Sequence, residues 1–235
     1  MDKKILGIIP ARAGSKRVKN KNFRPFAGTS LIELAINQAL SAKHLDSILV
    51  TSDSEEVLKV SSGYKHIISL ERPLKLANDL SPAIDYQKHA LDFMKKKFNK
   101  VFDFVVIIQP SSPLRNGSDI DATIELFLQN PDADSAVSVV KLPHMVHPHK
   151  LKKMKGDRLL PFIVDEGEKT AAHDLPDVYV RNCAVYIFKT SNIENDIQLG
   201  KHSLGYVMPE NKSVDINTMM DFKFAEFLYN NKISL

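Results

Sequence analysis

The chain has 235 residues, which is enough for one α/β domain with a small appended lobe and a substantial buried core. Its apolar runs are far too short to cross a bilayer, and only a few apolar residues separate Lys3 and Lys4 from Pro10, so we expect neither a membrane segment nor a signal peptide. A single cysteine, Cys183, excludes an intrachain disulfide and fits a reducing cytoplasm, where we expect the protein to work.

The net charge of +4 comes from one loop rather than from a broad face. Between Pro10 and Arg24 the chain carries no acidic residue and six cations: Arg12, Lys16, Arg17, Lys19, Lys21 and Arg24. Subtracting these six from the net charge leaves −2 for the other residues. Charge concentrated in one loop, with few interleaved aromatic residues, favours a small anionic ligand over a nucleic acid partner.

Segments with strand and helix patterns alternate through about residue 140. In chain order they are strand 3–10, helix 29–43, strand 45–53, helix start 54–60, helix 81–97, strand 102–110, helix 118–130 and strand 134–142. The strand at 102–110 is nearly all apolar, so we expect it to be central and covered on both faces. The alternation is typical of a three-layer, mostly parallel, Rossmann-like α/β sheet.

Residues near the predicted helix ends support this order. Ser30 or Thr29 can act as the N-cap of the first helix, and Asn217 or Thr218 can cap the last. Pro82 falls in the first turn of another helix, where its missing N–H costs little.

The alternation breaks in a stretch rich in proline, histidine and lysine, which we interpret as an inserted lobe at 143–175, a β-rich flap or arm. Strand character resumes at 177–188, and a final helix lies within 213–231. We therefore predict a single domain over residues 1–235 with one inserted lobe.

The basic loop follows the first predicted strand, and open parallel sheets bind ligands beyond the carboxyl ends of their strands. Gly14 permits close approach of the backbone to a phosphate, and Ser15 can donate from its N–H and hydroxyl groups. The loop is not a P-loop, because Ser15 separates Gly14 from Lys16, and it has one of the three glycines of a dinucleotide fingerprint. It therefore predicts a phosphate cradle of another kind, with a solvated basic loop as the alternative.

The segment "IIPARAGSKRVKNKN", residues 8–22, resembles the opening of the CMP-sialic acid synthetase family, cytidylyltransferases that activate nine-carbon keto-acid sugars. Further segments match the family in its own order: "TSDSEEV", "LANDLSP", "QPSSPLR", "HPHK", "LPDVYVRN" with "AVYIF", and "SVDINT". The resemblance covers nearly the whole chain. It implies a nucleotidyltransferase fold and the reaction of CTP with a sugar acid to give a CMP-sugar and pyrophosphate, by attack of the anomeric hydroxyl on the α-phosphate.

Carried over position by position, the resemblance implies a nucleotide site. Its residues are Ala11, Arg12, Ala13, Gly14, Ser15, Lys16, Lys21, Asn22, Asp79 and Ser81. Arg12 and Lys21 match catalytic positions on the triphosphate, and Asn22 matches a position near the α-phosphate. Asp79 and Ser81 fall in the stretch that contacts ribose and base, and the choice of cytosine rests on the resemblance alone.

The resemblance also implies a sugar site made of Gln109, Ser111, Ser112, Arg115, Lys150, Asn182 and Tyr186. Gln109 ends an apolar strand, where an amide can donate to and accept from a sugar, unless it simply meets water. Arg115 could equally be a surface cation. The family prefers Asn-Gly where this chain has Asn182-Cys183, and we expect Cys183 to be a small buried residue rather than a nucleophile.

Magnesium is the expected cofactor, with Asp215 and Asn217 as its ligands and as catalytic candidates. Mg²⁺ commonly takes one or two carboxylates and completes its shell with phosphate oxygens and water. The family usually has two aspartates here, whereas this chain reads Asp215-Ile216-Asn217. Asn217 can offer a carbonyl oxygen but cannot be a general base at neutral pH, and capping the last helix is its alternative role.

By the same resemblance the lobe presents Lys150 to the active site of a partner, which implies a homodimer with exchanged lobes. The family's companion arginine falls at Ala172, and His173 stands where glutamine is common. The lost cation favours a sugar of the legionaminic or pseudaminic type over N-acetylneuraminate. The histidines of "PHMVHPHK" match no common zinc spacing.

Two alternative functions stay open. One is a cytidylyltransferase for another sugar acid, for instance one with eight carbons. The other is a non-catalytic CTP-binding sensor, favoured by the departures from the family pattern at Cys183, Ala172 and Asn217.

Overall fold

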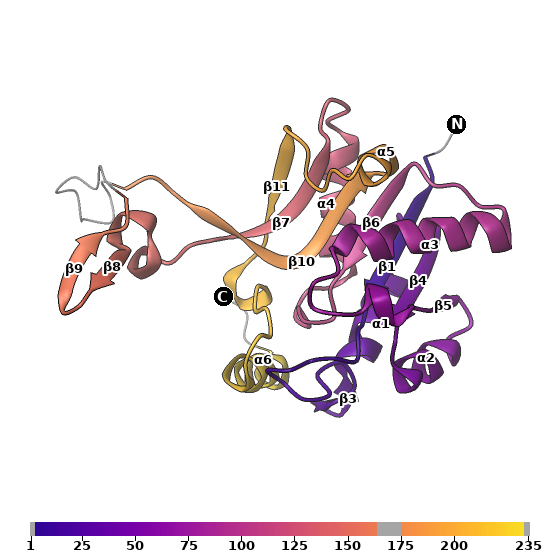
Figure 1. The fold of residues 1–235 in the computed structure, drawn as a ribbon, viewed down its shortest axis with the longest axis horizontal. Coiled ribbons are helices and arrows are strands. Elements are labelled where there is room, and N and C mark those ends of the chain that lie inside the picture. The colour runs from indigo at the N-terminus through magenta and orange to yellow at the C-terminus, as the bar shows by residue number, and fades with distance from the viewer. Residues whose placement is uncertain (1–2, 164–174, 233–235) are drawn as a thin grey trace.

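The computed structural model describes residues 3–163 and 175–232, and a seven-stranded sheet in the order β11-β7-β10-β6-β1-β4-β5 runs through it (Figure 1). Its strands are β1 (Ile5–Pro10), β4 (Ser47–Ser52), β5 (Ile67–Glu71), β6 (Phe104–Ile108), β7 (Ser135–Lys141), β10 (Tyr179–Lys189) and β11 (Ser203–Val207). β10 runs antiparallel to its neighbours β6 and β7, and the other six strands share one direction. The prediction of a mostly parallel sheet is therefore confirmed.

Helices cover both faces of the sheet and give the molecule three layers. α1 (Leu31–Ser41), α2 (Glu55–Ser62) and α4 (Gly117–Leu128) pack on one face, and α3 (Ala83–Phe98) and α5 (Thr190–Glu194) on the other. Ile5 and Ile9 of β1 contribute to the first core, and Leu6 and Ile8 to the second. A strand covered on both faces is apolar on both, which explains the continuous apolar runs of the sequence.

Most predicted elements lie within a few residues of the observed ones. β6 lies in the middle of the sheet, as its apolar sequence predicts, and Ser30 rather than Thr29 caps α1 by accepting from the Glu33 N–H. β5 and β11 have no counterpart in the sequence prediction. Within the described residues, no helix combines the length and apolarity that crossing a bilayer would require.

The remaining elements lie outside the seven-stranded sheet and the helices that cover it. They are β2 (Pro25–Phe26), β3 (Thr29–Ser30), the 3₁₀ turns η1 (Leu74–Leu76), η2 (His144–Val146), η3 (Pro148–Lys150) and η5 (Glu210–Lys212), the hairpin strands β8 (Lys152–Lys155) and β9 (Arg158–Pro161), and the last helix α6 (Met219–Asn231).

Residues 143–163, which we call the arm, stand away from the sheet (Figure 1). β7 and β10 continue past the sheet as a ribbon, in which Tyr179 pairs with Lys141, and β8 and β9 form an antiparallel hairpin at its end. Every residue of β8 and β9 is exposed. The arm lies in the stretch interpreted as an inserted lobe; the rest of that stretch up to residue 174, with Ala172 and His173, is outside the described residues.

A third core cluster joins the basic loop to the C-terminal segment. Val18, Phe26 and Leu31 pack with Ile216 and Phe222, and the Phe26 and Phe222 rings meet edge to face at 5.4 Å. The loop after β1 and the segment before α6 are therefore held at the same edge of the sheet.

Candidate active site

A cleft lies where the parallel strands β1, β5 and β6 end, at the edge where open α/β sheets bind ligands: Pro10, Arg72 and Gln109 line it. It has three adjoining compartments, and Gln109, the first residue after β6, lines all of them. We call them the basic, the middle and the far compartment. The basic and middle compartments share Arg12, and the middle and far compartments share Ala83 and Tyr86.

The basic compartment is a hollow for an anion. It is lined by Pro10, Arg12, Ser15, Lys16, Arg17, Val18, Lys21, Asn22, Gln109, Pro110, Ser111 and Asn217. Four of these described lining residues are cations and none is acidic. Such a set can neutralise several phosphate charges at once.

The loop around this compartment is anchored by its own polar groups. Asn22 is buried and donates from Nδ2 to the Arg12 carbonyl at 2.9 Å, and the Ala13 N–H donates to Asp53 Oδ1 at 2.8 Å. The Ser15 N–H donates to the Ala13 carbonyl, so the Ser15 hydroxyl rather than its amide remains for a ligand. Ala11 is buried, whereas Gly14 has open space around it.

Lys21 lies between the loop and the C-terminal segment. Its Nζ atom donates to the Ile216 carbonyl at 2.8 Å. Burial lowers the pKa of Lys21, Arg17 and Arg12 lower it further, and the Asp215 carboxylate opposes them. A bound anion would stabilise the charged form of this lysine.

Asp79 faces the cations of the basic compartment rather than away from them. Arg12 Nη1 lies 2.6 Å from Asp79 Oδ1, and Lys16 Nζ lies 2.5 Å from Oδ2. Lys16 and Arg12 hold the pKa of Asp79 below its usual value. Asp79 and Ser81 line the middle compartment, where the Ser81 hydroxyl donates to the Lys75 carbonyl at 2.6 Å.

The middle compartment contains a buried arginine that sequence reasoning missed. Arg72 follows β5, donates from Nη2 to the Thr51 carbonyl at 2.9 Å, and lies 4.5 Å from the centre of the Tyr86 ring. Burial lowers the pKa of Arg72. Because β5 was not predicted, Arg72 was not expected at the cleft. The signal that could have revealed the end of β5 is the Arg72-Pro73 step after a mostly apolar stretch.

The far compartment brings Gln109 and Tyr186 together, two residues of the predicted sugar site. It is lined by Ala83, Tyr86, Gln87, Ile107, Gln109, Arg181, Tyr186, Phe188, Gln198 and Leu199. Burial raises the pKa of Tyr186, so its hydroxyl stays protonated. Arg181 and Gln87 were missed because the strand pattern of 177–188 and the helix pattern of 81–97 do not show which residues border a hollow.

Three of the predicted sugar residues are buried, and their expected roles are corrected. Arg115 is 2% exposed and donates to the Gln109 and Ser112 carbonyls, so it is neither a surface cation nor open to a sugar. Burial lowers the pKa of Arg115 to about 9. Ser112 and Asn182 are buried as well, and the Ser112 hydroxyl lies 3.3 Å from the Asn182 carbonyl. These residues support the loop that carries Gln109 and Ser111.

The predicted metal ligands lie side by side. Asn217 Nδ2 donates to Asp215 Oδ2 at 2.8 Å, and Asn217 Oδ1 accepts from Arg17 Nη2 at 3.0 Å. Thr218, not Asn217, caps α6 through a capping box with Asp221. Asp215 therefore fits a metal ion as a single carboxylate, whereas the Asn217 oxygen faces a cation instead.

Cys183 adjoins this pair from β10. It has a left-handed backbone with φ of 61°, and its side chain is partly buried beside Tyr186 and Asp215. Burial raises the pKa of the Cys183 thiol, which keeps it protonated and makes it a poor nucleophile.

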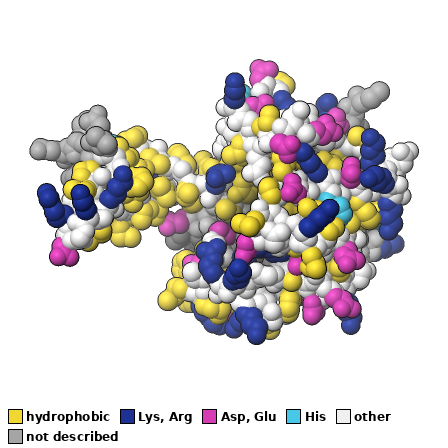
Figure 2. Space-filling model, in the orientation of Figure 1, with side chains coloured by type: hydrophobic (Ala, Val, Ile, Leu, Met, Phe, Trp, Pro, Cys, Tyr) yellow, Lys and Arg dark blue, Asp and Glu magenta, His cyan; other side chains and the backbone are white. Residues whose placement is uncertain are grey.

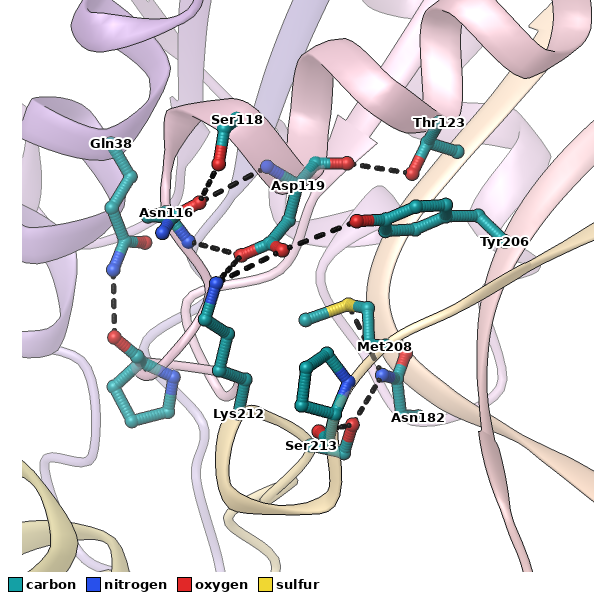
Figure 3. A network of polar contacts seen from close by, with 12 residues as sticks. Gln38, Asn116, Ser118, Asp119, Thr123, Asn182, Tyr206, Met208, Lys212 and Ser213 are labelled. Atoms are coloured by element: carbon teal, nitrogen blue, oxygen red, sulfur yellow. Dashed lines mark hydrogen bonds and ion pairs between the residues drawn. The ribbon is translucent and has the colours of Figure 1, made fainter. Parts of the chain in front are cut away.

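A buried polar network fixes the segment that leads to Asp215 (Figure 3). Lys212 Nζ lies 3.2 Å from both carboxylate oxygens of Asp119, whose side chain is 3% exposed. Asn182 Nδ2 donates to the Ser213 hydroxyl at 2.9 Å, and the Ile216 N–H donates to the Ser111 carbonyl at 2.8 Å. Residues 212–216 are thus tied to α4, to β10 and to the loop after β6.

Lys150 belongs to η3 on the arm and lines none of the three compartments of its own chain. Its Nζ atom is 3.0 Å from His144 Nδ1. The His147 and His149 rings stack, with centroids 5.4 Å apart, and His147 Nε2 lies 3.1 Å from the Pro176 carbonyl. Among the described residues, the histidines form no cluster suited to a metal ion.

Comparison with known proteins relates this cleft to a family. The family profile described as Cytidylyltransferase matches residues 6–199. The chain is 30% identical to the pseudaminic acid cytidylyltransferase of Campylobacter jejuni subsp. jejuni, with 96% of each protein covered. It is 32% identical to the CMP-N,N'-diacetyllegionaminic acid synthase of the same subspecies, with 95% of this chain and 94% of that protein covered. The solved structure of CMP:2-keto-3-deoxy-manno-octonic acid synthetase complexed with CTP has a TM-score of 0.69 at 14% identity and covers 98% of this chain and 100% of that chain, which shows a shared fold.

Proposed function

The chain belongs to the cytidylyltransferase family, and from this premise we propose that it activates a nine-carbon keto-acid sugar, a nonulosonic acid, with CTP in the cytoplasm. The observation that carries the proposal is Gln109, which borders both the basic compartment and the far compartment. One side chain can therefore face a phosphate in the first and a sugar in the second. The relatives named for pseudaminic and legionaminic acids favour sugars of that type over neuraminate.

In this reaction the basic compartment receives the triphosphate. Arg12, Lys16 and Lys21 neutralise its charge and orient it, which is most of what phosphoryl-type transfer asks of a protein. The nucleoside extends into the middle compartment, past Asp79 and Ser81 to Arg72. The anomeric oxygen of the sugar bonds to the α-phosphorus while the bond to the bridging oxygen breaks, and pyrophosphate leaves with that electron pair as the hydroxyl proton is released.

A magnesium ion would be held by Asp215 together with phosphate oxygens of CTP. Its chemistry would be to neutralise charge that develops on the leaving pyrophosphate. Asn217 serves Asp215 instead, because its amide donates to Oδ2 and its oxygen is paired with Arg17. Activity should therefore require Mg²⁺ and tolerate the missing second aspartate.

The test is pyrophosphate release from CTP with Mg²⁺ and a panel of N-acetylneuraminic, legionaminic, pseudaminic and eight-carbon sugar acids. Turnover of a nonulosonic acid supports the proposal. Turnover of the eight-carbon acid alone would contradict the sugar class, and CTP binding without any turnover would indicate a sensor. Lys21→Met should abolish turnover, whereas the matched Lys19→Met variant, in the same loop but outside the basic compartment, should not.

The arm supports a dimer with exchanged lobes as part of this proposal. It exposes large apolar side chains, Met145, Met154, Leu159 and Phe162. Figure 2 shows hydrophobic atoms gathered on the arm and along the ribbon that leads to it. Exposed apolar surface of this kind marks protein contacts. In such a dimer Lys150 would meet the sugar carboxylate in the cleft of the partner.

Mixing two inactive variants tests the exchange. A dimer of one Lys21→Met chain and one Lys150→Met chain has one site with both changes and one with neither, so about a quarter to a half of wild-type activity should return on mixing. No recovery, with dimers observed by light scattering, would contradict the exchange of lobes.

A further inference from the structure

The far compartment contains a buried acceptor that the protein itself does not satisfy. Gln87, in the first turns of α3, is 1% exposed and lines this compartment. Its Oε1 atom has no hydrogen-bond partner among the described residues. Buried carbonyl oxygens are nearly always paired, because leaving one unpaired forfeits its hydration. A buried acceptor that borders a hollow therefore indicates a donor supplied by a ligand, or by water until the ligand arrives.

The surroundings of Gln87 restrict what that donor can be attached to. Ile107 and Phe188 are buried beside it, Leu199 completes an apolar wall, and the Phe188 ring stacks on Tyr186 with centroids 6.2 Å apart. A free hydroxyl group would satisfy the Gln87 oxygen but leave the apolar wall without a partner. An acylamino group offers both an N–H donor and a short apolar acyl chain.

Polar groups for the rest of a sugar acid lie on the other side of the same compartment. Gln109 adjoins the basic compartment, and Arg181 is the one cation among the described residues that line the hollow. A sugar acid bound with its anomeric end at Gln109 and its carboxylate between Arg181 and the Lys150 presented by a second copy of the chain would direct a substituent of the ring to Gln87 and the apolar wall.

We propose that Gln87 is a specificity-determining residue for the sugar: its Oε1 accepts a hydrogen bond from the N–H of an acylamino substituent, whose acyl group packs on Phe188 and Leu199. This inference rests on the proposed function and adds to it the substituent that the enzyme selects. A site built around a hydrogen-bond acceptor discriminates strongly against analogues that offer no donor at that position, because the acceptor then stays unpaired.

The experiment compares each acylamino sugar acid of the panel with the analogue that has an acyloxy group in its place, which keeps the acyl chain but has no N–H donor, in the wild type and in Gln87→Met. Methionine has a similar length but no acceptor. The wild type should prefer the acylamino sugar, and Gln87→Met should reduce that preference about tenfold through KM for the sugar, with KM for CTP unchanged. Its melting temperature should change little, because removal of an unpaired buried oxygen offsets the loss of the side-chain hydrogen bond between Gln87 and Tyr86.

A matched control separates specificity from packing. Gln38 on α1 also has a buried, unpaired Oε1 among the described residues, but it lines none of the three compartments. Gln38→Met should leave the sugar preference unchanged. Equal sugar preference in wild type and Gln87→Met, or no preference in the wild type, would overturn the inference about Gln87. No turnover of any sugar by the wild type would instead overturn the proposed function with it.

Discussion

Lys212 Nζ lies 3.2 Å from both carboxylate oxygens of Asp119, and this pair joins the segment that carries Asp215 to the start of α4. The Asp119 side chain is 3% exposed and also accepts from the Asn116 N–H and the Tyr206 hydroxyl. Asp215 follows Lys212 by three residues. The next residue, Ile216, donates a hydrogen bond from its N–H to the Ser111 carbonyl. The pair therefore sets the position of the Asp215 carboxylate relative to the loop after β6.

Replacing Lys212 by methionine should lower both stability and kcat. Removing one partner of a buried ion pair leaves the other charge uncompensated, and we expect a loss of about 3 kcal/mol in the free energy of unfolding, measured by urea denaturation. Because Lys212 acts through Asp215, kcat should fall while KM for CTP changes little. Lys212→Arg should recover part of the stability and part of kcat.

The control is an exposed pair on α6. Lys223 and Glu226 are 2.9 Å apart with 66% and 23% of their side chains exposed. Lys223→Met should cost at most about 0.5 kcal/mol and leave kcat unchanged. An equally small effect of Lys212→Met would contradict the positioning role of the buried pair.

Binding of CTP should weaken at high pH because of Lys21. Burial lowers the pKa of this lysine, so in the free protein it loses its proton at a lower pH than an exposed lysine does. Only the charged form attracts a phosphate, so CTP binding is strong below the lowered pKa and declines as the pH rises through it. Lys21→Arg stays charged and should move the decline to higher pH in calorimetric titrations. Identical pH profiles would contradict this assignment.

Asp79 tests whether a carboxylate competes with the triphosphate. Its carboxylate forms ion pairs with Arg12 and Lys16. Both cations lower the pKa of Asp79, Lys16 more than Arg12. If CTP must displace it, Asp79→Asn should tighten CTP binding severalfold and make that binding more sensitive to salt, because the two freed cations then pair with the triphosphate. The sequence analysis places Asp79 among the nucleotide contacts, so weaker binding of CTP by Asp79→Asn would favour direct contact with ribose or base over competition.

The sequence predicted the parts of the fold that depend on local pattern. The alternation of strands and helices, the central place of β6 and the Ser30 cap follow from apolar periodicity and capping chemistry. The resemblance to the cytidylyltransferases was confirmed, because its motifs keep the family's order along the chain. β5 and β11 were missed because they are the two edge strands of the sheet, and neither has the continuous apolar run that marks β6.

The site was harder to predict because burial is a property of the tertiary structure. Arg115 and Asn182 lie in motifs that the sequence assigns to the sugar, yet their side chains bond to backbone and neighbouring polar groups. Gln87 and Arg181 border the cleft, but each lies in a segment whose pattern describes only a helix or a strand, and Arg72 follows a strand that was not predicted. Which side chains meet at the ends of three different strands is set by packing of the whole sheet.

Cys183 offers a test of backbone strain inside the site. Its φ of 61° costs a residue with a side chain about 1 kcal/mol relative to glycine. Cys183→Gly should therefore raise the free energy of unfolding by about 1 kcal/mol, whereas Cys183→Ala keeps the strain and should give no gain. Both variants should retain turnover, because burial raises the pKa of the thiol and leaves it protonated beside Asp215. The pairing of β10 with β7 shifts register between Arg181 and Tyr186. Equal stability of all three proteins would show that this irregularity, rather than the residue at 183, determines the conformation. Loss of turnover in both variants would assign the thiol a part in catalysis.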